Sequence, residues 1–452
     1  MASTNLSKTP SSAGNRRKFN FSFWIKGTSY ISKYIFFSNS GSTESTLFFD
    51  ANSRFEYYEY NGSSKTTKVT TKRNFKDAGA WYHIVVSVDT TQSTDSNRVK
   101  IYVNGTQETD LENTTYGAQN FDSLFNNTTT QYIGSNASGG YFDGAMTHIH
   151  FNDGYNYDPS SFGETDSTSG IWKPKTTPSV TYGTNGYFLK FENSGAMGTD
   201  SSGNSNTYTV SGTLTQIVDT PNNNFAVLNP LPSQEFLSSA FYEYGGTNCR
   251  SSTANFIAGV SQFYLDKGKW YFEMQTATAD AHIGIAGENK IQNGGSTGGV
   301  NNRLFYYEDS TGYAYSYNGP NGMIYFSTPS DGTQTASYGN TFSSSDTLGC
   351  FVDLDNNKLY FSKNGTIQNS GTGYSIQDDI LYAFGTSVYQ SNSSLNYGNG
   401  SFKGVKLTGT TYSDANGFGI FKYSPNQGGA SNFDSSAKNF YALCTKNIKE
   451  FG

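Results

Sequence analysis

The chain has 452 residues, which is enough for two or three domains with ordinary hydrophobic cores. Charged residues make up only 15% and aromatic residues 16% of the chain, which excludes an intrinsically disordered protein, because disordered chains are rich in charge and poor in aromatic residues. A net charge of -6 gives no broad positive field for a phosphate backbone, so nucleic acid is not an expected partner.

Short runs of β-branched and aromatic residues recur between Gly, Asn and Ser clusters, and no long run has apolar residues at helical spacing. The expected fold class is therefore all-β, with two tandem antiparallel β-sandwiches. The clearest strand is Phe19 to Ile25, in which aromatic and polar residues alternate, and Asn104-Gly105 predicts a tight hairpin turn. The other strands predicted in the first half are 34–37, 47–49, 55–60, 81–88, 98–103 and 142–151.

From about residue 154 to 232 the sequence becomes rich in Asn, Gly, Ser, Thr and Pro, with strands expected only at 187–191 and 207–210. Pro221, Pro230 and Pro232 indicate rigid breaks before a second unit. The strands predicted beyond them are 270–274, 283–286, 313–317, 350–354, 358–361, 381–384 and 394–397. The expected organisation is a polar N-terminal arm (1–17), a jelly roll (18–175), a β-containing extension and connector (176–232), a second sandwich (233–410) and a C-terminal extension packed on it (411–452).

Ordered sequence blocks carry two resemblances. Phe21 to Trp24, Trp81 to Asp89, Ile101 to Gly105, Tyr132 to Gly134 and Phe142 to Met146 together resemble a concanavalin-A-like, laminin-G-type jelly roll. In the second half, Gly268 to Glu273, His282 to Ala286 and Leu348 to Asp355, which leads to Leu359 to Gly365, resemble a SPRY domain.

This combination is similar to fibre or appendage proteins of tailed bacteriophages, as are the opening Leu6 to Pro10, the connector Asp219 to Phe225 and the closing Tyr441 to Ile448. The resemblance implies a viral structural surface protein, a tail or head fibre that adheres to host-surface glycan or to other virion proteins, and homotrimers are common among such fibres. The expected location is the virion after synthesis in the host cytoplasm, since no signal peptide and no membrane-spanning apolar run are visible.

Three alternatives stay open. One is a capsid decoration or assembly protein without receptor binding, another is a secreted lectin, and the third is a polysaccharide-degrading enzyme. Glycosidases with a concanavalin-like fold carry paired carboxylates, but the Glu-x-Asp-x-Glu strand motif is absent. Glu56 and Glu59 differ by three positions, so we expect them on opposite faces of a strand as solvated carboxylates. No catalytic residue is predicted, and the chain is not expected to be an enzyme.

Metal sites are weakly indicated. His148 and His150 share a strand face if the alternation is regular, but no third ligand is evident, and His83 is expected to pack against its neighbours. Although laminin-G-type domains sometimes bind calcium, Asp353 to Asn357 is followed by Lys358 where a calcium loop needs glycine, which predicts a plain turn. No cofactor is predicted; calcium is possible but not indicated. The cysteines Cys249, Cys350 and Cys444 are expected to be buried thiols.

Exposed aromatic residues are the most plausible binding chemistry, because sugar rings stack on tyrosine while Asn and Asp bond to hydroxyl groups. Two segments combine these residue types, 155–158 and 313–318. The candidate ligand-binding residues are Tyr155, Tyr157, Asp158, Tyr313, Tyr315 and Asn318.

Overall fold

The computed structural model describes residues 4–167, 170–229, 240–251, 256–293, 312–330, 332–426 and 439–452. Within these residues the chain is almost entirely β, which confirms the predicted fold class. The helical elements are short: the 3₁₀ helices η1 (Asp95–Asn97), η2 (Pro159–Ser161) and η3 (Asn369–Gly371), and the α-helices α2 (Glu288–Asn293) and α3 (Thr445–Phe451). None of the described helices has the length and apolarity needed to cross a membrane.

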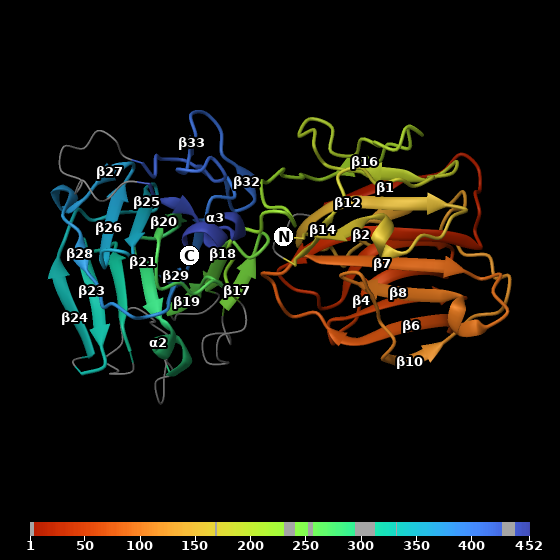
Figure 1. Cartoon of the computed structure of the whole chain (residues 1–452), viewed down its shortest axis with the longest axis horizontal. Helices are drawn as coiled ribbons and strands as arrows, with labels where there is room; N and C mark the ends of the chain where they lie inside the picture. Colours follow the sequence, from red (N-terminus) through yellow and green to blue (C-terminus); the bar gives the residue numbers. More distant parts are fainter. Residues whose placement is uncertain are drawn as a thin grey trace. The chain divides into compact units, whose positions relative to one another are not determined.

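The chain divides into two compact units (Figure 1). The first comprises residues 1–76 and 80–216, and the second comprises residues 77–79 and 217–452. The division after residue 216 falls inside the segment expected as extension and connector. Pro230 and Pro232, expected as breaks in that segment, lie outside the described residues.

The first unit is a sandwich of two antiparallel sheets and a short hairpin. One sheet has the order β10-β6-β5-β4-β3-β11-β1-β16, with β1 (Asn5–Lys8), β3 (Lys33–Ser40), β4 (Thr43–Phe49), β5 (Arg54–Tyr60), β6 (Lys65–Asn74), β10 (Leu111–Thr115), β11 (Gln131–Ile133) and β16 (Thr209–Ser211). The other has the order β15-β12-β2-β7-β8-β9, with β2 (Lys18–Gly27), β7 (Tyr82–Asp89), β8 (Val99–Val103), β9 (Thr106–Gln107), β12 (Gly144–Asp153) and β15 (Tyr187–Leu189). The hairpin pairs β13 (Gly163–Thr165) with β14 (Trp172–Pro174). We call the two larger sheets the eight-stranded and the six-stranded sheet. Residues 5–8, in the part expected as a polar arm, thus form β1 between β11 and β16.

Alternation decides which side chains enter this core. Phe19, Phe21, Phe23 and Ile25 of β2 are at most 2% exposed and pack against the inner residues of the eight-stranded sheet. The predicted turn at Asn104-Gly105 has positive φ at both residues, as such a hairpin requires.

The alternation predicted for β12 is interrupted. The register with β2 shifts between Thr147 and His150, and His148 has a φ of 47°, so β12 contains a bulge. Met146 packs against the core before the bulge and Ile149 after it. The bulge takes His148 and His150 off the face that holds Met146, but both rings lie against Phe188, with centroids 5.8 and 3.9 Å away, so the two histidines do share the outer face as expected.

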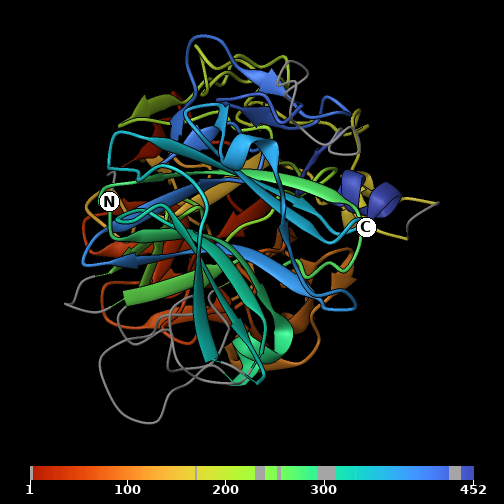
Figure 2. The ribbon, with the colours of Figure 1, turned by 90° about the vertical axis from the view of Figure 1, so that its left-hand side faces the viewer.

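The second unit is also a two-sheet sandwich, coloured green to blue in Figure 2. One sheet follows the order β17-β18-β30-β20-β25-β26-β27, with β17 (Ala240–Glu243), β18 (Asn248–Ser251), β20 (Lys269–Thr276), β25 (Thr347–Asp353), β26 (Lys358–Lys363), β27 (Thr366–Ile367) and β30 (Asn392–Asn396); β28 (Tyr374–Ser375) pairs with β26, and β35 (Tyr441–Ala442) with β20. The other sheet has the order β19-β29-β21-β22-β23-β24, with β19 (Phe256–Val260), β21 (Ala281–Gly287), β22 (Ala314–Asn318), β23 (Met323–Thr328), β24 (Gly332–Ser337) and β29 (Tyr382–Tyr389). Two short hairpins pair β31 (Ser401–Phe402) with β32 (Val405–Lys406) and β33 (Tyr412–Ser413) with β34 (Ile420–Phe421).

The C-terminal segment packs on the outer face of β20, β25 and β26. Tyr271, Phe351 and Tyr360 on these strands form one buried cluster with Phe421 and Phe440. Covering an apolar outer face in this way keeps aromatic surface out of water.

Candidate functional site

The predicted segment Tyr155 to Asp158 lies at the surface of the first unit. Tyr155 is 42% exposed and stacks on Tyr157, with ring centroids 6.1 Å apart and an interplanar angle of 15°. The Asp158 carboxylate accepts hydrogen bonds from the backbone N–H and the hydroxyl of Ser160, which fixes the start of η2. The structure therefore brings two aromatic faces and one exposed carboxylate together here.

The second predicted segment is enclosed instead. Tyr315 is 5% exposed and its hydroxyl accepts a hydrogen bond from the backbone N–H of Gln377 at 3.1 Å. Asn318 is 6% exposed and its amide is 2.9 Å from Nε2 of His282, while Tyr313 is half-buried against the core. β22 lies where a strand was predicted, but the expectation of exposed side chains is wrong here, because neighbouring strands and the 374–382 segment enclose them.

The carboxylates on β5 are not solvated, contrary to expectation. Glu56 and Glu59 are each 2% exposed. Glu59 lies inside the sandwich and accepts hydrogen bonds from Ser45, Tyr57 and Ser123, and burial raises its pKa to about 7. Glu56 lies on the opposite, outer face, so the two carboxylates do not form a pair.

The histidines of the first unit are packing residues. His83 lies between two indole rings: it stacks on Trp24 at 4.7 Å and accepts a hydrogen bond at Nδ1 from Nε1 of Trp172 at 2.9 Å. His150 stacks on Phe188 at 3.9 Å. Among the described residues no group of three or more His, Cys, Asp or Glu side chains could hold a metal ion.

The Asp353 to Asn357 turn and the three cysteines also have structural roles. Asn356 donates from its backbone N–H and its amide to Asp353, which is itself 0% exposed and paired with Lys269 at 3.0 Å. Cys249, Cys350 and Cys444 are buried free thiols, as predicted.

A stripe of aromatic rings crosses the outer face of the eight-stranded sheet, and sequence reasoning did not single it out. It consists of Tyr132, Phe37, Tyr34, Phe48 and Tyr58, from four neighbouring strands, and we call it the aromatic stripe. Successive centroids are 6.4, 5.6, 4.7 and 6.4 Å apart. All five rings lie outside the core cluster between the sheets, and Tyr34, Phe48 and Tyr132 keep part of their surface in solvent.

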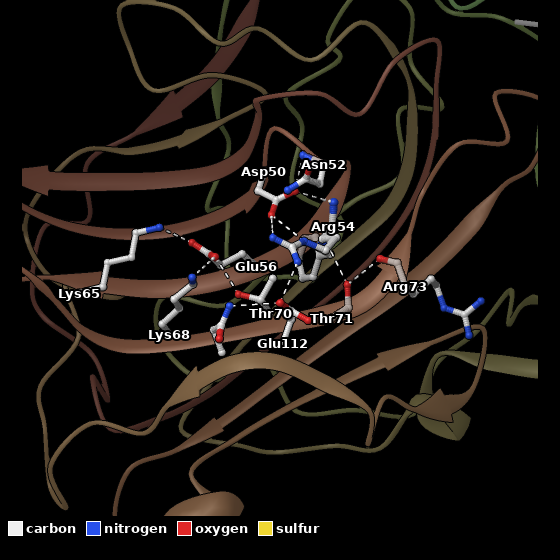
Figure 3. Close-up of polar contacts among 12 residues, drawn as sticks. Asp50, Asn52, Arg54, Glu56, Lys65, Lys68, Thr70, Thr71, Arg73 and Glu112 are labelled. Atoms are coloured by element: carbon white, nitrogen blue, oxygen red, sulfur yellow. Dashed lines mark hydrogen bonds and ion pairs between the residues drawn. The ribbon is translucent and has the colours of Figure 1, made fainter.

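One end of the stripe runs into a network of charges on β5 and β6 (Figure 3). The Lys65 ammonium lies 4.0 Å above the Tyr58 ring and also pairs with Glu56. Lys68 lies 3.6 Å from the same carboxylate, which in addition accepts a hydrogen bond from Thr70 at 2.7 Å. The buried charge of Glu56 is thus matched by two half-exposed ammonium groups.

Beside it, Arg54 joins two further carboxylates. Its guanidinium is 2.8 Å from Asp50 and 3.5 Å from Glu112 (Figure 3). Burial raises the pKa of Asp50, but hydrogen bonds from Arg54 and Asn52 outweigh burial and lower it overall. Each charge in this network is therefore neutralised within the face itself.

A sequence signal for the stripe does exist. In an antiparallel sheet with one face in water, polar residues alternate with apolar ones. Residues 34–37, 47–49 and 57–58 instead carry aromatic or aliphatic residues at successive positions. Strands with apolar residues on both faces indicate that the outer face is covered by other residues or binds a partner. A search for this departure from alternation would have found the stripe.

Comparisons with known proteins agree with the two folds. Residues 2–154 match the family model of the concanavalin A-like lectin/glucanases superfamily, and residues 269–400 match that of the SPRY domain. No curated protein is similar enough to count as a relative of the chain.

Solved structures resemble the units only distantly. A pentraxin from Limulus polyphemus is 17% identical and covers 34% of this chain and 71% of its own, with a TM-score of 0.25. The SPRY domain of human HERC1 is 12% identical (37% and 96%, TM-score 0.27), and domains LG4-5 of the mouse laminin α1 chain are 11% identical (87% and 85%, TM-score 0.27). From the family models, the chain carries a concanavalin A-like, laminin-G-type domain followed by a SPRY domain.

Proposed function

We propose that the chain is a non-enzymatic adhesion protein whose first unit binds a glycan on the outer face of the eight-stranded sheet. The aromatic stripe is the observation that carries this proposal. Strands lie about 4.8 Å apart, so rings on β11, β3, β4 and β5 extend over roughly 14 Å. Phe37 and Tyr58 are buried, so the rings open to a glycan are Tyr132, Tyr34 and Phe48, on the neighbouring strands β11, β3 and β4.

The charges along the stripe favour a neutral glycan. Lys65 and Lys68 are engaged by Glu56, and Arg54 is engaged by Asp50 and Glu112. A strongly acidic ligand would have to compete with these carboxylates for the same cations. Amides, hydroxyls and self-neutralised ions offer hydrogen bonds to sugar hydroxyl groups without that competition.

Substitution of half-buried stripe residues tests the proposal. Tyr34→Ala and Phe48→Ala each remove one ring face, and we expect each to weaken binding of a neutral polysaccharide by about 2- to 10-fold, measured by calorimetry on the full chain. Tyr412→Ala is the matched control, since Tyr412 is a 41% exposed tyrosine in the second unit. Equal affinities for all three variants and the unmodified protein would refute the assignment of this face.

The setting that we propose for this adhesion is a virion fibre or appendage, and it is supported by the sequence resemblance to phage fibre proteins. Antibody against the purified protein, labelled with gold, should then decorate tails or head fibres of particles made in infected host cells. Decoration of the whole capsid shell would favour the alternative of a decoration protein, and unlabelled particles would exclude a virion role.

A further inference from the structure

Asparagine followed directly by glycine occurs at nine positions of the chain. In such a pair the glycine nitrogen can bond to the side-chain carbonyl carbon of the asparagine, since glycine has no Cβ to obstruct the approach. The reaction needs an exposed amide, a glycine N–H without another acceptor, and an asparagine side chain turned toward the peptide that follows it. The nine pairs are 61–62, 104–105, 185–186, 293–294, 318–319, 321–322, 364–365, 399–400 and 416–417.

The turn between β5 and β6 meets all three requirements. Residues 61–64 are exposed. Oδ1 of Asn61 accepts hydrogen bonds from the backbone N–H groups of Ser63 and Ser64, each at 2.9 Å, which folds the side chain over the peptides that follow. Among the described residues the Gly62 N–H has no acceptor, so water has access to its proton.

The same two N–H groups favour attack on the Asn61 amide. They point at the oxygen on which negative charge develops when the Gly62 nitrogen bonds to Cγ. Donors that are already in place at a developing oxyanion lower the barrier of such a step. The order of this turn therefore supports ring closure instead of preventing it.

Glycine is also the residue that this turn requires. Gly62 has a φ of 90°, and a Cβ at this position would lie 2.6 Å from Oγ of Ser42. A larger residue, whose side chain would obstruct ring closure, is therefore disfavoured at position 62.

In four other pairs the glycine N–H is already engaged. The bonds run from Gly319 to the Ala281 carbonyl, from Gly322 to the Asn318 carbonyl, from Gly400 to Oδ1 of Asn396 and from Gly417 to the Asp414 carbonyl, at 3.0–3.1 Å. Removal of the glycine proton costs this hydrogen bond, so ring closure is slower at these pairs.

Two hairpin turns hold the asparagine amide in another direction. Oδ1 of Asn104 accepts from the His83 N–H, and Oδ1 of Asn364 accepts from the Thr347 N–H, each at 2.8 Å. These bonds turn the amide toward the neighbouring strand, away from the glycine that follows.

The remaining pairs do not compete with Asn61 in the described part of the chain. Asn185 is only 8% exposed, and its amide donates to the Ser12 carbonyl. Gly294 lies outside the described residues.

We propose that Asn61 is a site of spontaneous deamidation in the folded protein. The Gly62 nitrogen bonds to Cγ of Asn61, and Nδ2 leaves with the Gly62 proton as ammonia. One water molecule then opens the succinimide ring at either carbonyl, which gives aspartate or isoaspartate. The product carries one more negative charge than Asn61, and the inference does not depend on glycan binding.

The modification acts on the hairpin that carries the charged network. Tyr60 and Lys65 are the register partners that flank the turn, and Lys65 pairs with Glu56. Isoaspartate adds a methylene group to the main chain between β5 and β6. Because the turn and its length set the register of a hairpin, the modified turn holds this register less firmly.

The test follows each pair over time in the full chain at mildly alkaline pH, in the native state and unfolded in urea, with mass spectrometry of the peptides. Unfolding removes the structural differences, so each pair supplies its own reference rate. Native Asn61 should react at least as fast as it does in urea. The other described pairs should react more slowly in the native state than in urea, by roughly 5-fold or more.

Variants assign the change in charge to one residue. Asn61→Asp marks where the aspartate product elutes in anion exchange. Asn61→Gln should stop the growth of this species, because glutamine would have to close a six-membered ring. Asn321→Gln, at another exposed pair, is the matched control and should leave the reaction at Asn61 unchanged.

Two results would overturn the inference. One is protection of native Asn61 as strong as that of the other described pairs. The other is growth of the acidic species in Asn61→Gln at the rate of the unmodified protein.

Discussion

Two fully buried carboxylates, one in each unit, differ in what surrounds them. Burial raises the pKa of both Glu59 and Glu273 to about 7. The partners of Glu59 are three hydroxyl groups, and a hydroxyl can either donate or accept. Glu273 accepts from one hydroxyl, that of Tyr271, but also from the Asn396 amide and from the backbone N–H groups of Lys422 and Tyr423, and these N–H donors have no acceptor to offer.

This contrast predicts different responses to replacement by glutamine. A carboxyl group whose folded pKa is raised contributes stability at low pH, and this contribution is lost as the pH rises from about 4.5 to about 7. Glu59→Gln removes the buried charge and lets the hydroxyls reorient, so it should stabilise the protein at pH 8 and change little at pH 5. Glu273→Gln turns an NH₂ group toward fixed donors and should cost about 1–3 kcal/mol at both pH values.

Urea unfolding at pH 5 and pH 8 measures both effects. Glu56→Gln serves as a control for loss of a carboxylate on the outer face of the same strand as Glu59. Equal destabilisation by Glu59→Gln and Glu273→Gln would show that hydroxyl partners, which can either donate or accept, do not reduce the cost of replacing the carboxylate.

The residue pattern could place these side chains only in part. The spacing of Glu56 and Glu59 correctly put them on opposite faces of a strand, but their burial depends on Lys65, Lys68 and Ser123, which come from other elements. Exposure of Tyr155 was predictable from a polar, turn-rich segment. The burial of Tyr315 could not be predicted, because its hydroxyl is covered by Gln377, which lies sixty-two positions away in sequence.

At the scale of elements, aromatic periodicity predicted the strands that place aromatic side chains in the core. It missed strands that contribute few apolar side chains to the core. β6 has the sequence KTTKVTTKRN, in which Val69 is the one apolar residue, so it gave no signal although it carries the two lysines that pair with Glu56. The β12 bulge was hidden for another reason: an extra residue shifts the register without changing which residue types appear.

Three histidines of the six-stranded sheet, His83, His148 and His150, should make the stability of the first unit fall at acidic pH. Burial lowers the pKa of His83 to about 3 and that of His148 to about 4, and it lowers the pKa of His150 as well. The unfolded chain takes up protons near pH 6.5 while the folded unit does not, so stability is complete above that pH and is lost as the pH falls below it. Protonated His83 would also set two donors against each other, since Trp172 already donates to Nδ1.

The neighbouring charges do not reverse this direction. Glu192 favours the charged form of His148, whereas Lys190 and the other two histidines oppose protonation within the group. Tryptophan fluorescence during urea unfolding should therefore show a loss of up to about 2 kcal/mol per histidine between pH 6.5 and pH 5.

His150→Phe keeps the stack on Phe188 but removes one titrating group. Its pH dependence should be shallower by about one third, and stability at pH 7.5 should fall by about 1 kcal/mol, because the hydrogen bond to the Tyr182 hydroxyl is lost. His282→Phe, in the second unit, is the control. An unchanged slope in His150→Phe would exclude burial of this imidazole as a source of acid sensitivity.

At the scale of the whole molecule, each unit has a core cluster of its own. Separate cores predict that the two units unfold as separate cooperative steps. Glu59 and Glu273 provide one probe for each step, since they lie in different units. In a calorimetric scan of the full chain at pH 8, Glu59→Gln should raise the midpoint of one transition, and Glu273→Gln should lower that of the other. The double variant, Glu59→Gln with Glu273→Gln, should show each shift in its own transition, because substitutions at distant sites act independently.

A single transition moved by both substitutions would mean that the chain unfolds as one cooperative body.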